Sequence, residues 1–441
     1  MDLRAFLQSL ASTGELNEIS VEVSHDQQIA AICRREFATV GGKALLFRQV
    51  KDSSYPVVAN LFGSESRASK LLYADSFAGF SERLHRYLDN RVGSASNRLN
   101  STTTSSFTNS TQSFATTEIK LSSLPAIKSW PQEPHGYLNL ALAISESPED
   151  GTRNLGLYRG QIIDNQRIAL NFSAGSGLAT HLQQAKDRQQ KLPVTLFLGA
   201  DPALIWLACA PLPPKCDEFA LYSGLFGKNL EIAAGITNSI QYPASAEFVI
   251  EGTITPGETT LEGPFGNHSG QYVTRSDCPV LQVKSVHARD SAIYSTTVVG
   301  TPPSENIYLG KANEILIKQM LQIDYPLVSD IYMPKETIFH GVAFLAIKPQ
   351  SAVTIKKMIY TLWENSPLQK SKLLVLLDED IDLSSASKCW WRTINQLKTN
   401  RIYQSDGRTA IDATGVNPAM ILTEDMQITE LLQYRLNEDE L

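Results

Sequence analysis

A long succession of β-type segments in the middle of the chain most constrains its fold. From about Tyr137 to Thr297, short apolar stretches alternate with Gly, Pro and Asn. The stretches read YLNLALAIS, IALNFS, PVTLFLG, IWLACA, AEFVIEGTIT, PVLQVKSVHA and AIYSTTVVG. Short strands separated by turn residues are typical of a barrel or a curled sheet. The sequence therefore predicts a central β domain.

Mixed patterns precede this region. Strands are predicted in ALLFRQV and YPVVANLFG, and helical spacing is found at Leu3–Leu10, Ala30–Phe37 and Phe80–Leu88. Residues 100–117 consist almost entirely of Ser, Thr, Asn and Gln, which bury too little apolar surface to offset the entropy lost on ordering. We expect a linker or an exposed loop there.

The pattern changes again after Pro303. Apolar spacing becomes helical through Leu309–Ile323, and then AFLAI, a helix at Val353–Trp363, LLVLLD and a helix around Ala386–Leu397 follow. This alternation indicates a small βαβ-type domain. We predict an α/β (α+β) protein with an N-terminal α/β lobe (1–117), a central β domain (118–303), a linker helix (304–323) and a C-terminal domain (324–441).

Composition narrows the function classes. The 441 residues are 42% hydrophobic and 19% charged, as in ordinary globular proteins. A net charge of -7 opposes binding to nucleic acid or anionic lipid. The five cysteines include no CxxC pair, which favours a reducing compartment over a disulfide framework or a zinc ribbon. No signal-peptide pattern and no membrane-spanning apolar run is found, so we expect a cytoplasmic protein.

Two motifs suggest chemistry. Asn154 and Arg159 lie in NLGLYR, and Glu262 begins EGPFGNH, which ends in Asn267 and His268. Alone, each motif is more often a surface ion pair or a turn. Together with PLPPKCDE (211–218), YPASAEFVIEG (242–252) and VVGTPPSEN (298–306), in this order, they form a specific combination.

The combined motifs resemble the UbiD family of decarboxylases, over nearly the whole chain. The resemblance implies a split β-barrel domain that binds prenylated FMN and a C-terminal domain that forms a homodimer or a homohexamer. It also implies a flavin prenyltransferase as the cofactor supplier. The expected substrate is an aromatic or α,β-unsaturated carboxylic acid, and the enzyme, a carboxy-lyase, removes CO₂ from it or adds CO₂ in the reverse reaction.

The resemblance also implies catalytic residues. Arg159 takes the place of an arginine that orients the substrate carboxylate, and Glu262 takes the place of the first glutamate of a Glu–Arg–Glu network. The second acid falls on Asn267, whose amide has no acidic proton near neutral pH. Two residues could compensate: His268 could donate a proton through water, or Glu262 could take over. A purely structural His268 is the alternative.

The cofactor site is expected to be unusual as well. By resemblance it comprises Asn154, Gly156, Tyr158, Gly175, Ser176, Cys209, Pro211 and Glu218. Asn154 and Glu218 match two ligands of a divalent cation, Mn²⁺ or another, that accompanies K⁺ in the family. The third ligand is a histidine, which we align with Gly175, so metal binding is in doubt. His181 could substitute, but its surroundings predict an exposed helix. Alternatively, backbone N–H groups of the Gly175–Gly177 run could approach a phosphate, although a tight turn is the simpler interpretation.

Two interpretations stay open at this point. The chain could be a working decarboxylase with an altered proton donor and altered phosphate anchoring. It could instead be a non-catalytic UbiD-like protein, a pseudoenzyme or an accessory subunit, that has lost prenylated FMN and metal. A third, weaker alternative is a flavin-binding enzyme of another class, such as an isomerase.

Overall fold

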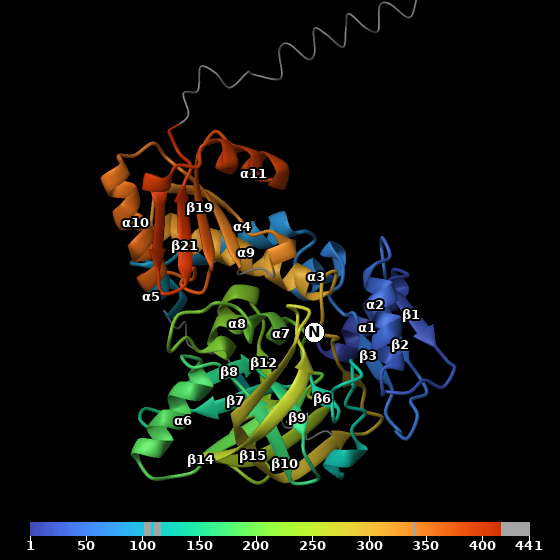
Figure 1. Ribbon diagram of the computed structural model, residues 1–441. Coiled ribbons are helices and arrows are strands. Elements are labelled where there is room, and N and C mark those ends of the chain that lie inside the picture. Colours follow the sequence, from blue (N-terminus) through green and yellow to red (C-terminus); the bar gives the residue numbers. More distant parts are fainter. Residues whose placement is uncertain (101–106, 110–115, 338–340, 416–441) are drawn as a thin grey trace, which may run out of the picture. The chain divides into compact units, whose positions relative to one another are not determined.

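The computed structural model describes residues 1–100, 107–109, 116–337 and 341–415 (Figure 1). The chain forms two compact units, Met1–Asp324 and Tyr325–Leu441. Helices and strands interleave in both, as the predicted α/β (α+β) class requires. The predicted domain boundaries at residues 117 and 303 stay a prediction.

The first unit begins with short helices around a small sheet. Its strands lie in the order β1-β2-β3-β16, where β1 and β2 are parallel and β2 and β3 are antiparallel. Four apolar side chains of α1 are buried, and the Asp2 carboxylate accepts a hydrogen bond from the Ala5 N–H and so caps the helix. The elements are α1 (Leu3–Ser12), β1 (Leu16–Ile19), α2 (Gln28–Phe37), β2 (Ala44–Phe47), β3 (Val57–Ala59), α3 (Glu65–Leu71), α4 (Phe77–Asp89), α5 (Ala95–Asn100) and β16 (Tyr294–Ser295). The three helices predicted here are confirmed.

A large curled antiparallel sheet follows. Its strand order is β6-β9-β10-β15-β14-β11-β7-β8, with β5 paired to β15. The long strands β14 and β15 form its central hairpin (Figure 1). Register shifts interrupt this hairpin at several places, and such bulges bend strands. The strands are β5 (Thr116–Glu118), β6 (Tyr137–Leu138), β7 (Leu142–Glu146), β8 (Arg153–Leu157), β9 (Arg159–Ile162), β10 (Arg167–Asn171), β11 (Leu192–Leu198), β14 (Phe248–Gly266) and β15 (Tyr272–Arg289).

Helices and a second small sheet accompany the curled sheet. The small sheet has the order β13-β12-β4. The elements are β4 (Phe107–Asn109), a 3₁₀ turn at Leu121–Ser123, α6 (Gly177–Asp187), α7 (Ala203–Leu207), α8 (Glu218–Phe226), β12 (Leu230–Ala233) and β13 (Tyr242–Pro243). The predicted central β domain is thus confirmed in its main strands.

Three local predictions are wrong. IWLACA, taken as a strand, begins in helix α7 with Ile205–Leu207 and continues as a turn. The Ala203 N–H bonds to the Asp201 carboxylate at the start of this helix, and a short apolar run does not distinguish a buried helix from a strand. Glu262, whose motif EGPFGNH is typical of a turn, lies on β14. Within the polar stretch 100–117, the described segments Phe107–Asn109 and Thr116–Glu118 pair with β12 and β15, because backbone pairing needs no apolar side chain. The other residues of that stretch from 101 on lie outside the described part.

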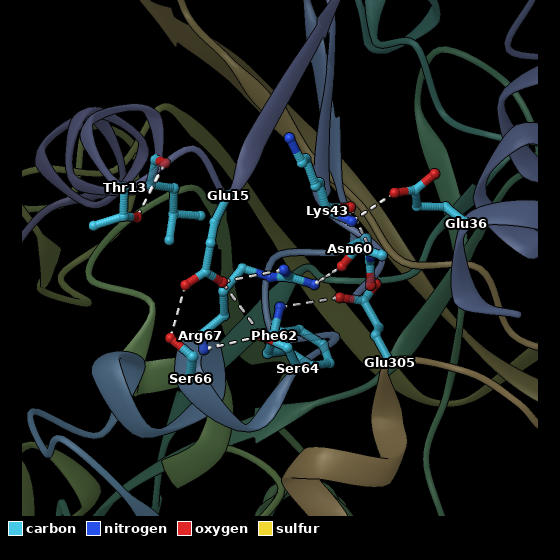
Figure 2. A network of polar contacts seen from close by, with 12 residues as sticks. Thr13, Glu15, Glu36, Lys43, Asn60, Phe62, Ser64, Ser66, Arg67 and Glu305 are labelled. Atoms are coloured by element: carbon cyan, nitrogen blue, oxygen red, sulfur yellow. Dashed lines mark hydrogen bonds and ion pairs between the residues drawn. The ribbon is translucent and has the colours of Figure 1, made fainter. Parts of the chain in front are cut away.

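A buried polar network joins the N-terminal lobe to the segment that precedes α9 (Asn306–Asp324). Figure 2 shows Glu15, Arg67 and Glu305 close together. Arg67 is 1% exposed, approaches Glu15 at 3.3 Å and donates to the Gly42 carbonyl at 2.8 Å. One carboxylate oxygen of Glu305 accepts the Phe62 N–H at 3.3 Å. Burial raises the pKa of Glu305 to about 7.

The second unit is a five-stranded sheet with helices. Its order is β17-β18-β19-β21-β20, with a parallel centre and antiparallel pairs at both edges. The predicted strand and helix alternation is confirmed. The elements are β17 (Val328–Tyr332), a 3₁₀ turn at Lys335–Thr337, β18 (Val342–Ile347), α10 (Ala352–Asn365), β19 (Leu373–Asp378), α11 (Ala386–Asn395), a second such turn at Thr399–Arg401, β20 (Ile402–Ser405) and β21 (Arg408–Asp412).

Candidate active site

A buried ion pair lies inside the curled sheet. The Arg159 Nε and Nη2 donate to Glu262 Oε1 and Oε2 at 2.8 and 3.0 Å, a two-point contact. Glu262 is fully buried, whereas the Arg159 side chain keeps 24% of its surface exposed. The guanidinium also lies 4.3 Å from the centre of the Phe265 ring. The structure thus brings together the two charged residues that the motifs suggested.

Sheet curvature makes this pair possible. Arg159 lies on β9 and Glu262 on β14, and strands β10 and β15 lie between them in the sheet order (Figure 1). In the pairwise ladders, Arg159 lies opposite Asn171 and Glu262 opposite Arg275. The four residues therefore belong to four adjacent strands, and the curled sheet lets the side chains from its two outer members meet.

Two of these four residues escaped the motif analysis. Asn171 Nδ2 donates to Glu262 Oε2 at 2.8 Å, and Arg275 Nη1 donates to the Phe172 carbonyl at 2.8 Å. The available signal for Asn171 was its position as a lone Asn within the apolar strand segment IALNFS. Arg275 had no comparable signal, because its role depends on which strand lies beside β14.

Asn267 and His268 lie in the turn between β14 and β15. The Asn267 amide oxygen accepts the His268 N–H at 2.7 Å, and the Asn267 backbone bonds to Gln271 and Gly270. Both side chains are half-buried. The Asn267 oxygen therefore stabilises its own turn.

Tyr137 lies near the ion pair, with its ring centre 4.7 Å from that of Phe265. Its hydroxyl is buried and makes no hydrogen bond among the described residues. Burial, followed by the charges of Glu262 and Glu133, raises the pKa of Tyr137, so the phenol keeps its proton at neutral pH. Glu133 accepts N–H groups of Ser129, Trp130 and Gly266, which ties the segment before β6 to the end of β14.

A second polar cluster surrounds strand β8. The Asn154 Nδ2 is buried and lacks a hydrogen-bond partner within the part of the chain described here. Burial raises the pKa of Tyr158. The neighbouring Asn154 and Ser176 side chains lower this pKa, but by less than burial raises it. Glu218 accepts the Leu155 N–H at 2.9 Å, and burial raises its pKa to about 8, so its carboxyl is largely protonated at neutral pH.

Cys209 and Pro211 follow helix α7 beside this cluster. The Leu157 N–H bonds to the Ala208 carbonyl at 3.0 Å, which brings the segment alongside β8. The Cys209 thiol points to the Trp206 carbonyl at 3.3 Å, and burial raises its pKa to about 12. This cysteine is therefore a neutral thiol rather than a nucleophile.

Comparison with known proteins shows the family of this chain. Residues 7–86, 102–302 and 307–415 match the N-terminal, Rift-related and C-terminal domains of 3-octaprenyl-4-hydroxybenzoate carboxy-lyase, UbiD. An uncharacterized protein of Aquifex aeolicus is 32% identical over 414 residues, which cover 91% of this chain and 85% of the relative. The chain belongs to the UbiD family.

Solved structures of UbiD-class enzymes share the fold. An evolved dimeric form of HmfF from Pelotomaculum thermopropionicum, in complex with prFMN, matches with a TM-score of 0.78 at 23% identity, covering 98% of this chain and 99% of HmfF. The vanillic acid decarboxylase of Sedimentibacter hydroxybenzoicus in its closed form matches with a TM-score of 0.83 at 22% identity, covering 99% and 98%. This chain therefore shares the fold of these UbiD-class enzymes over nearly its whole length.

Part of the expected metal-ligand set is present. Among the described residues, no group of three His, Cys, Asp or Glu side chains could hold a metal ion. Glu218 is buried and has one oxygen bonded to the Leu155 N–H. A cation there would find Asn154 and Glu218 without a third UbiD-type ligand. The function proposed below therefore contains no step through a metal.

Two glycines, Gly175 and Gly177, shape the backbone where helix α6 begins beside Asn154. Gly175 has a φ of +82°, and a Cβ placed there would meet nothing within 4 Å. A Cβ on Gly177 would instead lie 1.9 Å from Asn154 Oδ1. Gly177, the first residue of α6, thus packs directly against the Asn154 side chain, whereas Gly175 supplies the left-handed backbone of the preceding turn.

His181 is not exposed, contrary to the sequence prediction. Its side chain is buried on α6, and its Nδ1 lies 2.9 Å from the Ser145 hydroxyl. Burial lowers the pKa of His181, so the ring is neutral at neutral pH. The Gln-rich and charged neighbours of His181 suggested exposure, but its own helix face packs inward.

No helix in the described ranges is both long and apolar enough to cross a membrane.

Proposed function

We propose that this chain is a prenylated-FMN-dependent decarboxylase, acting on an aromatic or α,β-unsaturated carboxylic acid or carrying out the reverse carboxylation. Membership of the UbiD family supports the reaction class. The observation that carries the proposal is the buried two-point contact between Arg159 and Glu262. The prFMN complex of HmfF, which has the same fold, supports the choice of cofactor.

Arg159 would bind the substrate carboxylate. Its guanidinium is planar and presents five N–H donors, of which Nε and Nη2 are used by Glu262. The exposed part of the side chain leaves donors for a second carboxylate. Glu262 and the Phe265 ring fix the plane of the guanidinium, so that the substrate is oriented before CO₂ leaves.

The cluster around β8 would hold the flavin. The buried Asn154 Nδ2 is a donor without a partner in the described ranges, and a phosphate oxygen would satisfy it. Tyr158, Ser176, Cys209 and Pro211 belong to the same cluster or to the segment beside it. When bound, the prenylated flavin supplies the covalent chemistry that makes loss of CO₂ possible, while the protein orients the substrate and moves the proton.

His268 would supply the proton to the substrate carbon. Asn267 has no acidic proton, and its oxygen already accepts the His268 N–H. Both oxygens of Glu262 accept hydrogen bonds from N–H donors, which suits a carboxylate and disfavours a proton donor. An imidazole ordinarily titrates near pH 6.5 and so can donate near neutrality, directly or through water.

A second candidate function is a non-catalytic UbiD-family protein that binds neither metal nor prenylated FMN. One observation favours it: Gly175, which is aligned with the expected histidine ligand, lies in the turn before α6 and offers no side chain to a metal ion. Under this alternative, the Arg159–Glu262 pair serves only the stability of the sheet.

The test combines cofactor analysis with substrate screening. The protein would be purified after co-expression with a flavin prenyltransferase and examined by mass spectrometry, absorbance and metal analysis. A panel of aromatic and acrylic acids would then be screened for CO₂ release. Prenylated FMN in the sample, with turnover that Arg159→Ala abolishes, is the expected result. A colourless protein without turnover on any panel member would favour the non-catalytic alternative.

A further inference from the structure

Within the described ranges, three N–H groups donate to the Glu262 carboxylate. Arg159 Nε donates to Oε1, whereas Oε2 accepts both Arg159 Nη2 and Asn171 Nδ2. Motif matching places the third member of this network at Asn267. In the structure, the Asn267 amide oxygen bonds within its own turn, and Asn171 from the neighbouring strand β10 contacts Glu262.

Asn171 is itself held in one orientation. Its Oδ1 lies 3.4 Å from Arg275 Nη1, and its Nδ2 lies 2.8 Å from Glu262. A guanidinium only donates and a carboxylate only accepts, so the amide oxygen must face Arg275 and the amide nitrogen must face Glu262. Arg275 is fixed in turn by the Phe172 carbonyl and by Asp277 at 3.0 Å.

The ladder positions explain why Asn171 reaches the pair. Asn171 lies opposite Arg159 in the β9–β10 ladder, and Arg275 lies opposite Glu262 in the β14–β15 ladder. Glu262 therefore contacts one arginine directly and a second one through the Asn171 amide. An apolar residue at position 171 would leave Oε2 with a single donor in a buried site, which is unfavourable for a carboxylate.

We propose that Asn171 is a positioning residue that completes the Arg159–Glu262 network and, with Arg275 behind it, holds Glu262 as the acceptor that orients Arg159 toward the substrate. This inference rests on the proposed decarboxylase function. It gives Asn171 the third place in the network, which motif matching gives to Asn267. The reaction then relies on Glu262 for orientation and not for proton donation.

The first experiment follows turnover of the holoenzyme on the best acid from the panel. Asn171→Leu should lower kcat about 10- to 100-fold, the range of a hydrogen bond to a charged group, with a much smaller change in KM. The acid limb of its pH–rate profile should move to higher pH, because the ionised carboxylate has lost a hydrogen-bond donor. Asn171→Gln, which keeps the amide donor, should recover part of the rate.

A matched control separates positioning from stability. Asn139 is a buried asparagine whose amide donates to the Thr297 carbonyl at 2.9 Å. Asn139→Leu should also lower the unfolding free energy, yet it should leave the pH–rate profile in place. Equal displacement of the profile by both leucine variants would overturn the proposal.

The second experiment needs no turnover. Urea denaturation of the full chain compares the unfolding free energies of Asn171→Leu, Glu262→Gln and the double variant. The two losses should be strongly non-additive, because both substitutions break the same hydrogen bond. Additive losses refute the role of Asn171. Non-additive losses in a protein without any turnover would refute the decarboxylase function and keep the network.

Discussion

Glu305 offers a quantitative test of the buried network in Figure 2. Its carboxyl is 1% exposed, and burial raises its pKa from an ordinary 4.5 to about 7. The Phe62 N–H bonds to the ionised form, and Arg67 stabilises its charge, but neither outweighs desolvation. In the folded protein this acid therefore stays protonated over a range in which it ionises in the unfolded chain.

Proton linkage gives the direction in which the folding stability changes with pH. Between about pH 4.5 and pH 7 the folded chain binds more protons at this site than the unfolded chain, so stability falls as the pH rises. Below pH 4.5 the contribution of Glu305 is fully present, and above pH 7 it is lost. A pKa difference of about 2.5, at about 1.36 kcal/mol for each pH unit, amounts to roughly 3 kcal/mol.

Urea denaturation at pH 5 and pH 8 measures this contribution. Glu305→Gln removes the titrating group, so the difference in unfolding free energy between the two pH values should shrink by roughly 2–3 kcal/mol. Glu18→Gln, at a half-exposed carboxylate that pairs with Arg48, is the control and should show no comparable effect. If Glu305→Gln keeps the whole pH dependence of the parent protein, the assignment of a buried, protonated Glu305 is wrong.

The remaining predictions concern the candidate site. Arg159→Lys should lower kcat/KM at least about 10-fold in the decarboxylation assay, because an ammonium cannot make the two-point contact with a carboxylate; unchanged kinetics would count against the proposed role. Gly177→Ala should lower the unfolding free energy by roughly 1–3 kcal/mol in urea denaturation, because its Cβ would lie 1.9 Å from Asn154 Oδ1 and displace that side chain; an unchanged unfolding free energy would count against this packing. Asn267→Glu should leave turnover intact or raise it, since it adds an acid at the turn, and a complete loss would show that the amide itself is needed. Glu218→Gln should raise the unfolding free energy above about pH 8 relative to the parent, because the buried carboxyl no longer has to ionise; equal unfolding curves at pH 9 would contradict its raised pKa.

The errors of the sequence analysis share one physical origin. The local sequence pattern shows which side chains are apolar, but it does not show which other parts of the chain pack against them. The segment of α7 is apolar all round, so its period carried no information, and the charged neighbours of His181 concealed one inward-facing turn of α6. Pairing of the polar segments Phe107–Asn109 and Thr116–Glu118 depends on strand edges supplied from far along the chain.

By itself, the sequence determined the family, the α/β class, the order of β-rich and helical regions and the pair Arg159 and Glu262. Each of these depends on residue types at fixed spacing, which a single chain displays directly. Only the tertiary structure decided that Asn171 and Arg275 join that pair and that Gly177, not Gly175, packs against Asn154. Those contacts join strands and helices distant in sequence, and they exist because a curled sheet brings side chains from non-neighbouring strands within hydrogen-bond distance.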